Sequence, residues 1–103
     1  MEKADEAGEI LRLVAVGEFK IAEHTFNRGA ERGISREQII HCAAHCIYHK
    51  WQESQGTHIF VGFLDANASG GFSAVMRSGV IIVTVFRRRL SRWEKNLIKS
   101  KKP

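Results

Sequence analysis

The sequence predicts an α+β fold in which helices come first and an antiparallel sheet follows. Three observations carry this prediction. Apolar residues recur at helical spacing through the first half of the chain, β-branched and aromatic residues dominate residues 57–86, and Ser78-Gly79 between two such runs is a hairpin signal. We therefore expect two to three N-terminal helices packed on a four-stranded antiparallel sheet, with a short helix at the C-terminal end.

Three helices are expected in the N-terminal half. The first covers residues 5–16, and the second covers residues 24–32 and stops at Gly33, which can adopt a left-handed conformation. The third begins at a capping box, in which Ser35 and Gln38 satisfy each other's backbone amides.

The second half is expected to form the sheet, with residues 65–71 as a loop. The expected strands are residues 48–52, 57–64, 72–77 and 80–86. A two-residue turn at 78–79 fixes the register, so that Ser73 opposes Thr84 and Arg77 opposes Val80 on the face away from the core. Ser91 and Glu94 form a second capping box, and Trp93 and Leu97 of that helix are expected to dock on the body.

Length and composition indicate a single domain over residues 1–103. The chain is 44% hydrophobic and 26% charged, which is ordinary for a globular protein. The longest apolar run is too short to span a membrane, the first residues resemble no secretory signal, and two cysteines four residues apart indicate reduced thiols. We therefore expect a cytoplasmic protein that does not contact membranes.

The basic charge is concentrated at the C-terminal end. Residues 87–103 hold eight of the sixteen Lys and Arg residues and one acid, Glu94. Such a block is typical of a surface that binds nucleic acid or an acidic protein, and it is equally compatible with a solubilising end.

His24, Arg28 and Arg32 recur at i, i+4 and i+8 and would share one stripe of the second helix. This combination suits a phosphate, because the imidazole can move a proton near neutral pH and the guanidinium groups can hold negative charge. The alternative interpretation is a solvated helix face whose C-terminal arginine is favoured by the helix dipole.

Two motifs together resemble a known family. His-x3-Arg-x3-Arg-Gly-Ile-Ser begins at His24, and Val-x-Thr-Val-Phe-Arg ends at Arg87. The pattern, over residues 8–90, resembles a small bacterial and phage family of unknown function near the RelE/ParE-type toxins, in the superfamily of barnase-like and colicin-type ribonucleases. The resemblance implies helices on one face of a four-stranded antiparallel sheet, and a functional cleft on or beside the other face.

The resemblance further implies RNA cleavage without a metal or other cofactor. His24 would transfer a proton, Arg28 and Arg87 would clamp the phosphate, and Thr84 would orient it by a hydrogen bond. RNA is then the expected partner, and an antitoxin protein is expected if the chain is the toxin half of a toxin–antitoxin pair.

The sequence contains no obvious carboxylate for the second proton transfer, so His49 or His58 would have to serve. Some members of the superfamily inhibit DNA gyrase and are not nucleases. The alternative is therefore a non-enzymatic protein-binding module, such as a phage or plasmid regulator. Enzymatic activity and oligomeric state remain open at this point.

A larger set of basic residues is expected to bind the RNA backbone. The hairpin register adds Ser73 and Arg77 to the expected site. The helix stripe and the C-terminal block supply the other basic residues. The expected nucleic-acid-binding residues are Arg32, Arg77, Arg88, Arg89, Arg92 and Lys95.

A competing pattern invites a metal site. His41 and His45 are four residues apart on the predicted third helix, and so are Cys42 and Cys46, one step around it. The four cannot hold one tetrahedral ion, because neighbouring residues on a helix point about 100° apart. The cysteines are expected to behave as small apolar core residues, so no metal is assigned.

Overall fold

The computed structural model describes residues 3–25, 33–66 and 68–101, with side chains over 5–25, 33–66 and 68–96. It confirms the α+β class. In chain order the elements are α1 (Lys3–Ala15), β1 (Lys20–Ile21), α3 (Arg36–Ala44), β2 (Cys46–Gln52), β3 (Thr57–Asp65), β4 (Ala68–Met76), β5 (Val80–Arg87) and α4 (Arg92–Lys101). A helical turn at residues 23–25 follows β1.

The sheet differs from the expected four-stranded antiparallel one. It has five strands in the order β1-β5-β4-β3-β2, and β1 pairs with β5 in parallel, so the sheet is mixed. Lys20 lies opposite Ile81, and the Ala22 amide donates to the Ile82 carbonyl at 3.1 Å. Two residues are too few to produce a strand periodicity in the sequence, which explains why the prediction missed β1.

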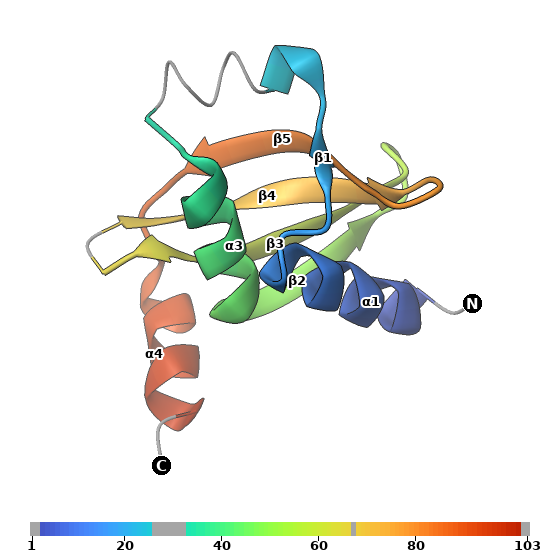
Figure 1. The fold of residues 1–103 in the computed structure, drawn as a ribbon. Coiled ribbons are helices and arrows are strands. Elements are labelled where there is room, and N and C mark those ends of the chain that lie inside the picture. The colour runs from blue at the N-terminus through green and yellow to red at the C-terminus, as the bar shows by residue number, and fades with distance from the viewer. Residues whose placement is uncertain (1–2, 26–32, 67, 102–103) are drawn as a thin grey trace.

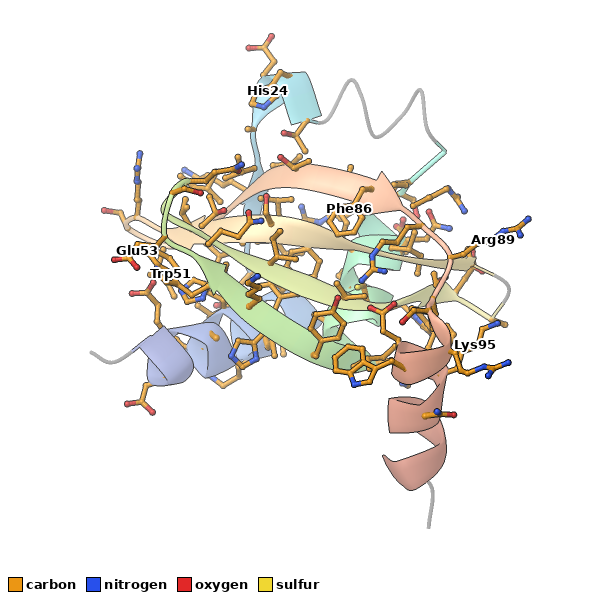
Figure 2. All side chains as sticks on the ribbon, turned by 180° about the vertical axis from the view of Figure 1, so that it is seen from behind. His24, Trp51, Glu53, Phe86, Arg89 and Lys95 are labelled. Carbon is orange, nitrogen blue, oxygen red and sulfur yellow. The ribbon has the colours of Figure 1, made fainter. Side chains whose placement is uncertain are left out.

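Helices α1 and α3 cover one face of the sheet and leave the other face open (Figure 1). Phe60 of β3 and Phe72 of β4 lie at the centre of the covered face, with their rings stacked 5.0 Å apart. Ile10 and Val14 of α1 and Cys42 of α3 pack in the same fully buried cluster. The view from behind shows the open face, with α4 at one end of it (Figure 2).

The β4–β5 hairpin corrects the predicted register in half of its length. The connection has three residues, 77–79, in which the Arg77 amide donates to the Gly79 carbonyl, so Val80 pairs with Met76 instead of Arg77. A β-bulge at Val83 then adds one residue to β5. The two offsets cancel, so that Ser73 does oppose Thr84 as predicted.

Strand β4 begins earlier than expected, inside the segment predicted to be a loop. Gly70 and Gly71 suggested a loop, yet both lie in the strand. They are glycines because neighbouring backbone atoms leave no room for a Cβ. A Cβ on Gly71 would lie 2.0 Å from the Phe60 carbonyl oxygen, and one on Gly70 would lie 2.1 Å from the Phe86 carbonyl oxygen. These glycines permit close approach of the backbone here, not a turn.

The helix ends follow local sequence signals. Gly17, with φ of 81°, closes α1, and its amide donates to the Val14 carbonyl at 3.0 Å. The predicted capping box at the start of α3 is present, since Ser35 and Gln38 each accept from the other's backbone amide. Gly33 has φ of 69°, the left-handed conformation expected there.

Candidate functional site

The open face of the sheet carries a row of polar and apolar side chains that α1 and α3 do not cover. Ser73 and Thr84 are directly opposed on β4 and β5, and Thr84 is exposed. On β3, Val61 belongs to a second buried apolar cluster, together with Ile47 and Leu90. The predicted hydroxyl pair therefore lies on a surface that ligands can reach at its β5 side.

His24 lies on the helical turn at residues 23–25, beside the outer edge of β5, and it is exposed (Figure 2). Its neighbour Thr25 is only 2% exposed, and the Thr25 hydroxyl donates to the Val83 carbonyl. Val83 is the extra residue of the β-bulge, so the bond from Thr25 is made at the bulge. Thr84, the predicted partner of His24, is the next residue along β5.

Arg87 is held at the other end of the same edge. Its Nη2 donates to the Gly33 carbonyl at 2.7 Å. Thr25 and Gly33 are thus each bonded to β5, at positions four residues apart, about 13 Å at the usual rise per residue. Arg28 and Arg32, the other cations of the predicted stripe, lie outside the described residues.

Neither proposed source of a second proton-transfer group joins His24. His58 is fully buried on the face covered by α1, where its Nε2 lies 2.8 Å from Oε1 of Glu6. Its Nδ1 has no hydrogen-bond partner among the described residues. His49 is exposed on β2, and its ring lies 6.0 Å from that of Phe60. β2 and β5 are separated by two strands, so His49 lies far from β5.

Arg88 corrects the expectation of a free cationic surface. Its guanidinium binds both carboxylate oxygens of Glu94, one of them at 2.8 Å, and donates to the Tyr48 hydroxyl at 2.5 Å. Glu94 also completes the predicted capping box, because it accepts from the Ser91 amide at 2.8 Å while Ser91 Oγ accepts from the Glu94 amide at 3.2 Å. Arg88 is therefore a structural residue that ties the end of β5 to β2 and α4.

Glu94 is 2% exposed and yet stays ionised. Burial raises the pKa of this carboxyl, but hydrogen bonds from Arg88, the Ser91 amide and Tyr48 outweigh burial and lower the pKa from 4.5 to about 2. In the same cluster, burial raises the pKa of Tyr48, which keeps the phenol protonated. The carboxylate of Glu94 is therefore buried and neutralised by Arg88, which is itself partly exposed.

The other described cations behave as expected, whereas Trp93 does not. Arg77 is exposed at the hairpin end, and Arg89, Arg92 and Lys95 are exposed around the start of α4. Trp93 was expected to dock on the body, but it is 59% exposed, and its ring meets that of Tyr48 in an edge contact with ring centroids 5.4 Å apart. The buried residue of this turn is Glu94. The Leu97 side chain lies outside the described residues.

The His41–Cys46 segment forms no metal centre in the described part of the chain, where no group of three or more His, Cys, Asp or Glu residues is placed to hold an ion. α3 ends at Ala44, so Cys46 starts a strand and no longer shares a helix face with Cys42. His41 instead places Nδ1 2.8 Å from the Phe63 carbonyl oxygen. Burial raises the pKa of Cys42 to about 12, so it is an inert core thiol.

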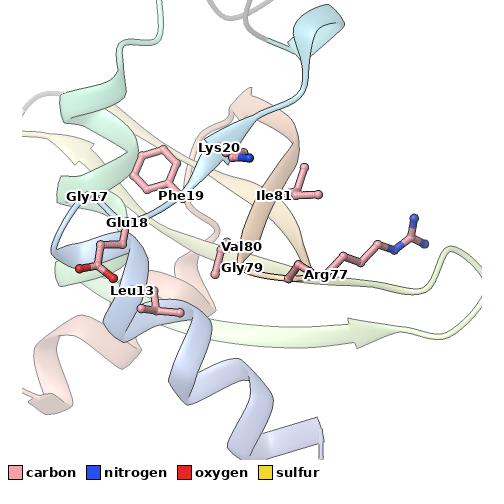
Figure 3. Close-up of a pocket in the computed structure, with 10 residues that line it drawn as sticks. Leu13, Gly17, Glu18, Phe19, Lys20, Arg77, Gly79, Val80 and Ile81 are labelled. Atoms are coloured by element: carbon pink, nitrogen blue, oxygen red, sulfur yellow. The ribbon is translucent and has the colours of Figure 1, made fainter.

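A pocket lies elsewhere, between the end of α1, β1 and the β4–β5 hairpin (Figure 3). Glu18, Lys20 and Arg77 surround an apolar floor that includes Phe19. Arg77 is the only residue of the predicted site that lines it. The pocket therefore adds no support to the predicted catalytic group.

Two features of the site were missed in the sequence. The Thr25–Val83 bond depends on a bulge, which has no sequence signal here. The Arg88–Glu94–Tyr48 cluster had a partial signal, since a capping-box glutamate six residues after an arginine can bind it, but Tyr48 comes from a distant strand.

No helix in the described part of the chain is long and apolar enough to cross a membrane. No protein-family model, curated protein or solved structure matches the chain, so its assignment rests on its own residues and geometry.

Proposed function

We propose that this protein is a RelE/ParE-like, metal-independent endoribonuclease that acts as the toxin of a toxin–antitoxin pair. The observation that carries the proposal is the bond from the Thr25 hydroxyl to the Val83 carbonyl. It holds the turn bearing His24 beside the strand position next to Thr84. The predicted proton-transfer group and the predicted phosphate-orienting hydroxyl thereby belong to one edge of β5.

The proposed reaction is transesterification within RNA. His24 takes the proton of a ribose 2′-hydroxyl, the 2′-oxygen bonds to phosphorus, and the bond from phosphorus to the 5′-oxygen breaks. The leaving 5′-oxygen takes a proton from solvent water, and the products are a 2′,3′-cyclic phosphate and a 5′-hydroxyl. Thr84 orients the phosphate, and Arg28 and Arg87 stabilise its added negative charge. Arg87 is three residues from Thr84 and therefore starts from the opposite face of β5, so it would reach the phosphate around the strand edge while its Nη2 donates to the Gly33 carbonyl.

The test is cleavage of single-stranded RNA by purified protein in the presence of a chelator. His24→Ala should reduce the rate by about 10²- to 10⁴-fold, the range for a lost proton-transfer group. His45→Ala is the matched control, because His45 is also exposed but lies at the end of α3. It should retain the wild-type rate. Cleavage that is absent, or equal in the His24→Ala variant, would contradict the proposal.

One observation favours the alternative, a non-enzymatic protein-binding module. Among the described residues, neither His49 nor His58 lies beside His24 to protonate the leaving group. If the wild-type protein cuts no RNA, a toxin that acts by binding a host protein such as gyrase becomes the better proposal. In that case a gyrase supercoiling assay with the wild-type protein and a Thr84→Arg variant would test it.

A further inference from the structure

The indole of Trp93 is exposed to an extent unusual for a large apolar side chain. It is 59% exposed, and within the described residues only Val16, at the end of α1, is another large hydrophobic side chain with comparable exposure. Single exposed apolar residues are common in proteins, so exposure alone assigns no role. What distinguishes Trp93 is how it is held and what surrounds it.

The position of Trp93 is fixed on both sides. Its ring lies against the ring of Tyr48 at 5.4 Å with an interplanar angle of 64°, an edge contact. The next residue, Glu94, is buried in the ion pair with Arg88, whose guanidinium also donates to the Tyr48 hydroxyl. The ion pair between Arg88 and the buried Glu94 thus anchors the first turn of α4, from which the Trp93 side chain extends into solvent.

The segment that contains Trp93 is positively charged. Arg89, Arg92 and Lys95 are all exposed, and Figure 2 shows Arg89 and Lys95 at the α4 end of the open face. Glu94 is the single acid in residues 87–96, and Arg88 neutralises it. The charge left at the surface of residues 87–96 is therefore cationic.

We propose that Trp93 is a stacking platform for an unpaired base of single-stranded RNA, with Arg89, Arg92 and Lys95 contacting the adjoining phosphates. This deepens the proposed function, on which it rests for RNA as the partner. An anchored, exposed aromatic ring with exposed cations in the same segment matches both parts of a single strand, since the ring takes a base and the cations take the backbone. An acidic protein would be attracted by the cations but has no base to place on the indole.

The experiment measures binding separately from cleavage. The probe is a 2′-O-methylated oligouridylate of twelve nucleotides, which has no 2′-hydroxyl to attack the phosphate. In a Trp51→Phe background Trp93 is the single tryptophan, so its fluorescence reports directly on this site. We expect the probe to quench this fluorescence. Trp93→Ala should weaken binding by between about 5-fold and about 150-fold with an unchanged salt dependence, whereas Trp93→Phe should stay much closer to wild type.

The cations should produce a different signature. Replacing Arg89, Arg92 and Lys95 together by Gln should reduce the slope of log affinity against log salt by about 2, because each phosphate contact to a single strand contributes about 0.7. An abasic oligomer of equal length should bind the wild type and Trp93→Ala equally. Val16→Ala is the matched control for loss of an exposed apolar side chain, and it should leave binding unchanged.

Three results would overturn the inference. They are absence of Trp93 quenching when the probe binds, equal affinity of Trp93→Ala and wild type, and equal quenching by a polyglutamate peptide, which would assign the surface to an acidic protein. Because the probe cannot be cut, these results are independent of His24 and of the cleavage assay. Circular dichroism confirms that the variants are folded, and Trp93→Phe keeps the test valid if the alanine variant is not.

Discussion

Glu94→Gln isolates the contribution of one buried ion pair to stability. The two capping boxes make this substitution informative, because α3 already has a glutamine at the equivalent position, Gln38, and caps normally. Glu94→Gln can therefore keep the cap through its amide oxygen, while it removes the negative charge and the second acceptor that face Arg88. Any change in the free energy of unfolding then reports on the charge pair and not on loss of the helix start.

The expected magnitude follows from the pKa of Glu94. The carboxyl titrates near 4.5 when unfolded and at about 2 when folded, a difference of about 2.5 pKa units, or about 3 kcal/mol at about 1.4 kcal/mol per unit. Because the folded pKa is the lower one, this stabilisation is complete above about pH 5 and is lost as the pH falls towards 2. The wild type should lose about 3 kcal/mol more than Glu94→Gln over that interval.

The assay is urea unfolding at several pH values between 7 and 2. Circular dichroism follows the whole fold, and Trp93 fluorescence in a Trp51→Phe background follows the start of α4. If α4 detaches before the sheet unfolds, the pH dependence will appear in the fluorescence transition alone. Parallel pH profiles for the wild type and Glu94→Gln by both signals would refute the reasoning, because the carboxylate would then contribute no net stability.

Three further predictions test the core and the β5 edge. Gly71→Ala should prevent folding, because its Cβ would lie 2.0 Å from the Phe60 carbonyl oxygen. Gly8→Ala on α1 adds a Cβ that meets nothing within 4 Å, so it should raise the free energy of unfolding by about 0.5–1 kcal/mol in thermal denaturation. Thr25→Val should lower the free energy of unfolding by about 1–3 kcal/mol and reduce RNA cleavage, because the Val83 carbonyl loses its donor. Thr25→Ser keeps the hydroxyl and should retain both the stability and the cleavage rate. Cys42, whose pKa is raised to about 12, should resist alkylation at pH 8 in the folded protein and react once urea unfolds it, as mass spectrometry would show. Similar stability for Gly71→Ala and Gly8→Ala, an unaffected Thr25→Val, or rapid labelling of Cys42 would contradict these expectations.

The features predicted correctly from the sequence are those encoded by adjacent residues. Both capping boxes are present because an N-cap serine and the residue three positions later form a local unit. The left-handed glycine after the second predicted helix, Gly33, is similarly local. Strand β1 was missed because two residues carry no pattern, and it exists only because β5 supplies an edge for Lys20 and Ile21. Features that depend on a distant partner had no signal.

The hairpin shows how a correct pairing can follow from an incorrect turn. The sequence indicated a two-residue turn, whereas the actual connection has three residues and shifts the pairs nearest to it by one. The bulge at Val83 removes this shift before Thr84. The Ser73–Thr84 pairing was therefore predicted correctly, although both the turn length and the bulge were missed. Polar content near a turn does not predict this bulge, which coincides with a bond from a distant residue, the Thr25 hydroxyl, to the Val83 carbonyl.

The three consecutive arginines at the end of β5 explain why charge alone did not define the site. Successive residues of a strand point to opposite faces, so Arg87 and Arg88 separate: Arg87 reaches Gly33, and Arg88 enters the cluster with Glu94. Arg89 follows the end of the strand and remains exposed. The three arginines therefore have different roles: Arg87 binds the Gly33 carbonyl, Arg88 pairs with Glu94, and Arg89 is an exposed cation.

β5 therefore connects both ends of the proposed RNA surface. Through Val83 it holds the turn that carries His24, and through Arg88 it holds the turn that presents Trp93. Trp93 rests on Tyr48 of β2, three interstrand spacings from β5, or about 14 Å at about 4.8 Å each. An RNA strand that reaches from Trp93 to Thr84 must cross the face that α1 and α3 leave open. In the proposed complex, the open face, the anchored indole and the His24 turn form one RNA path, and β5 is bonded to the turns at both ends of that path.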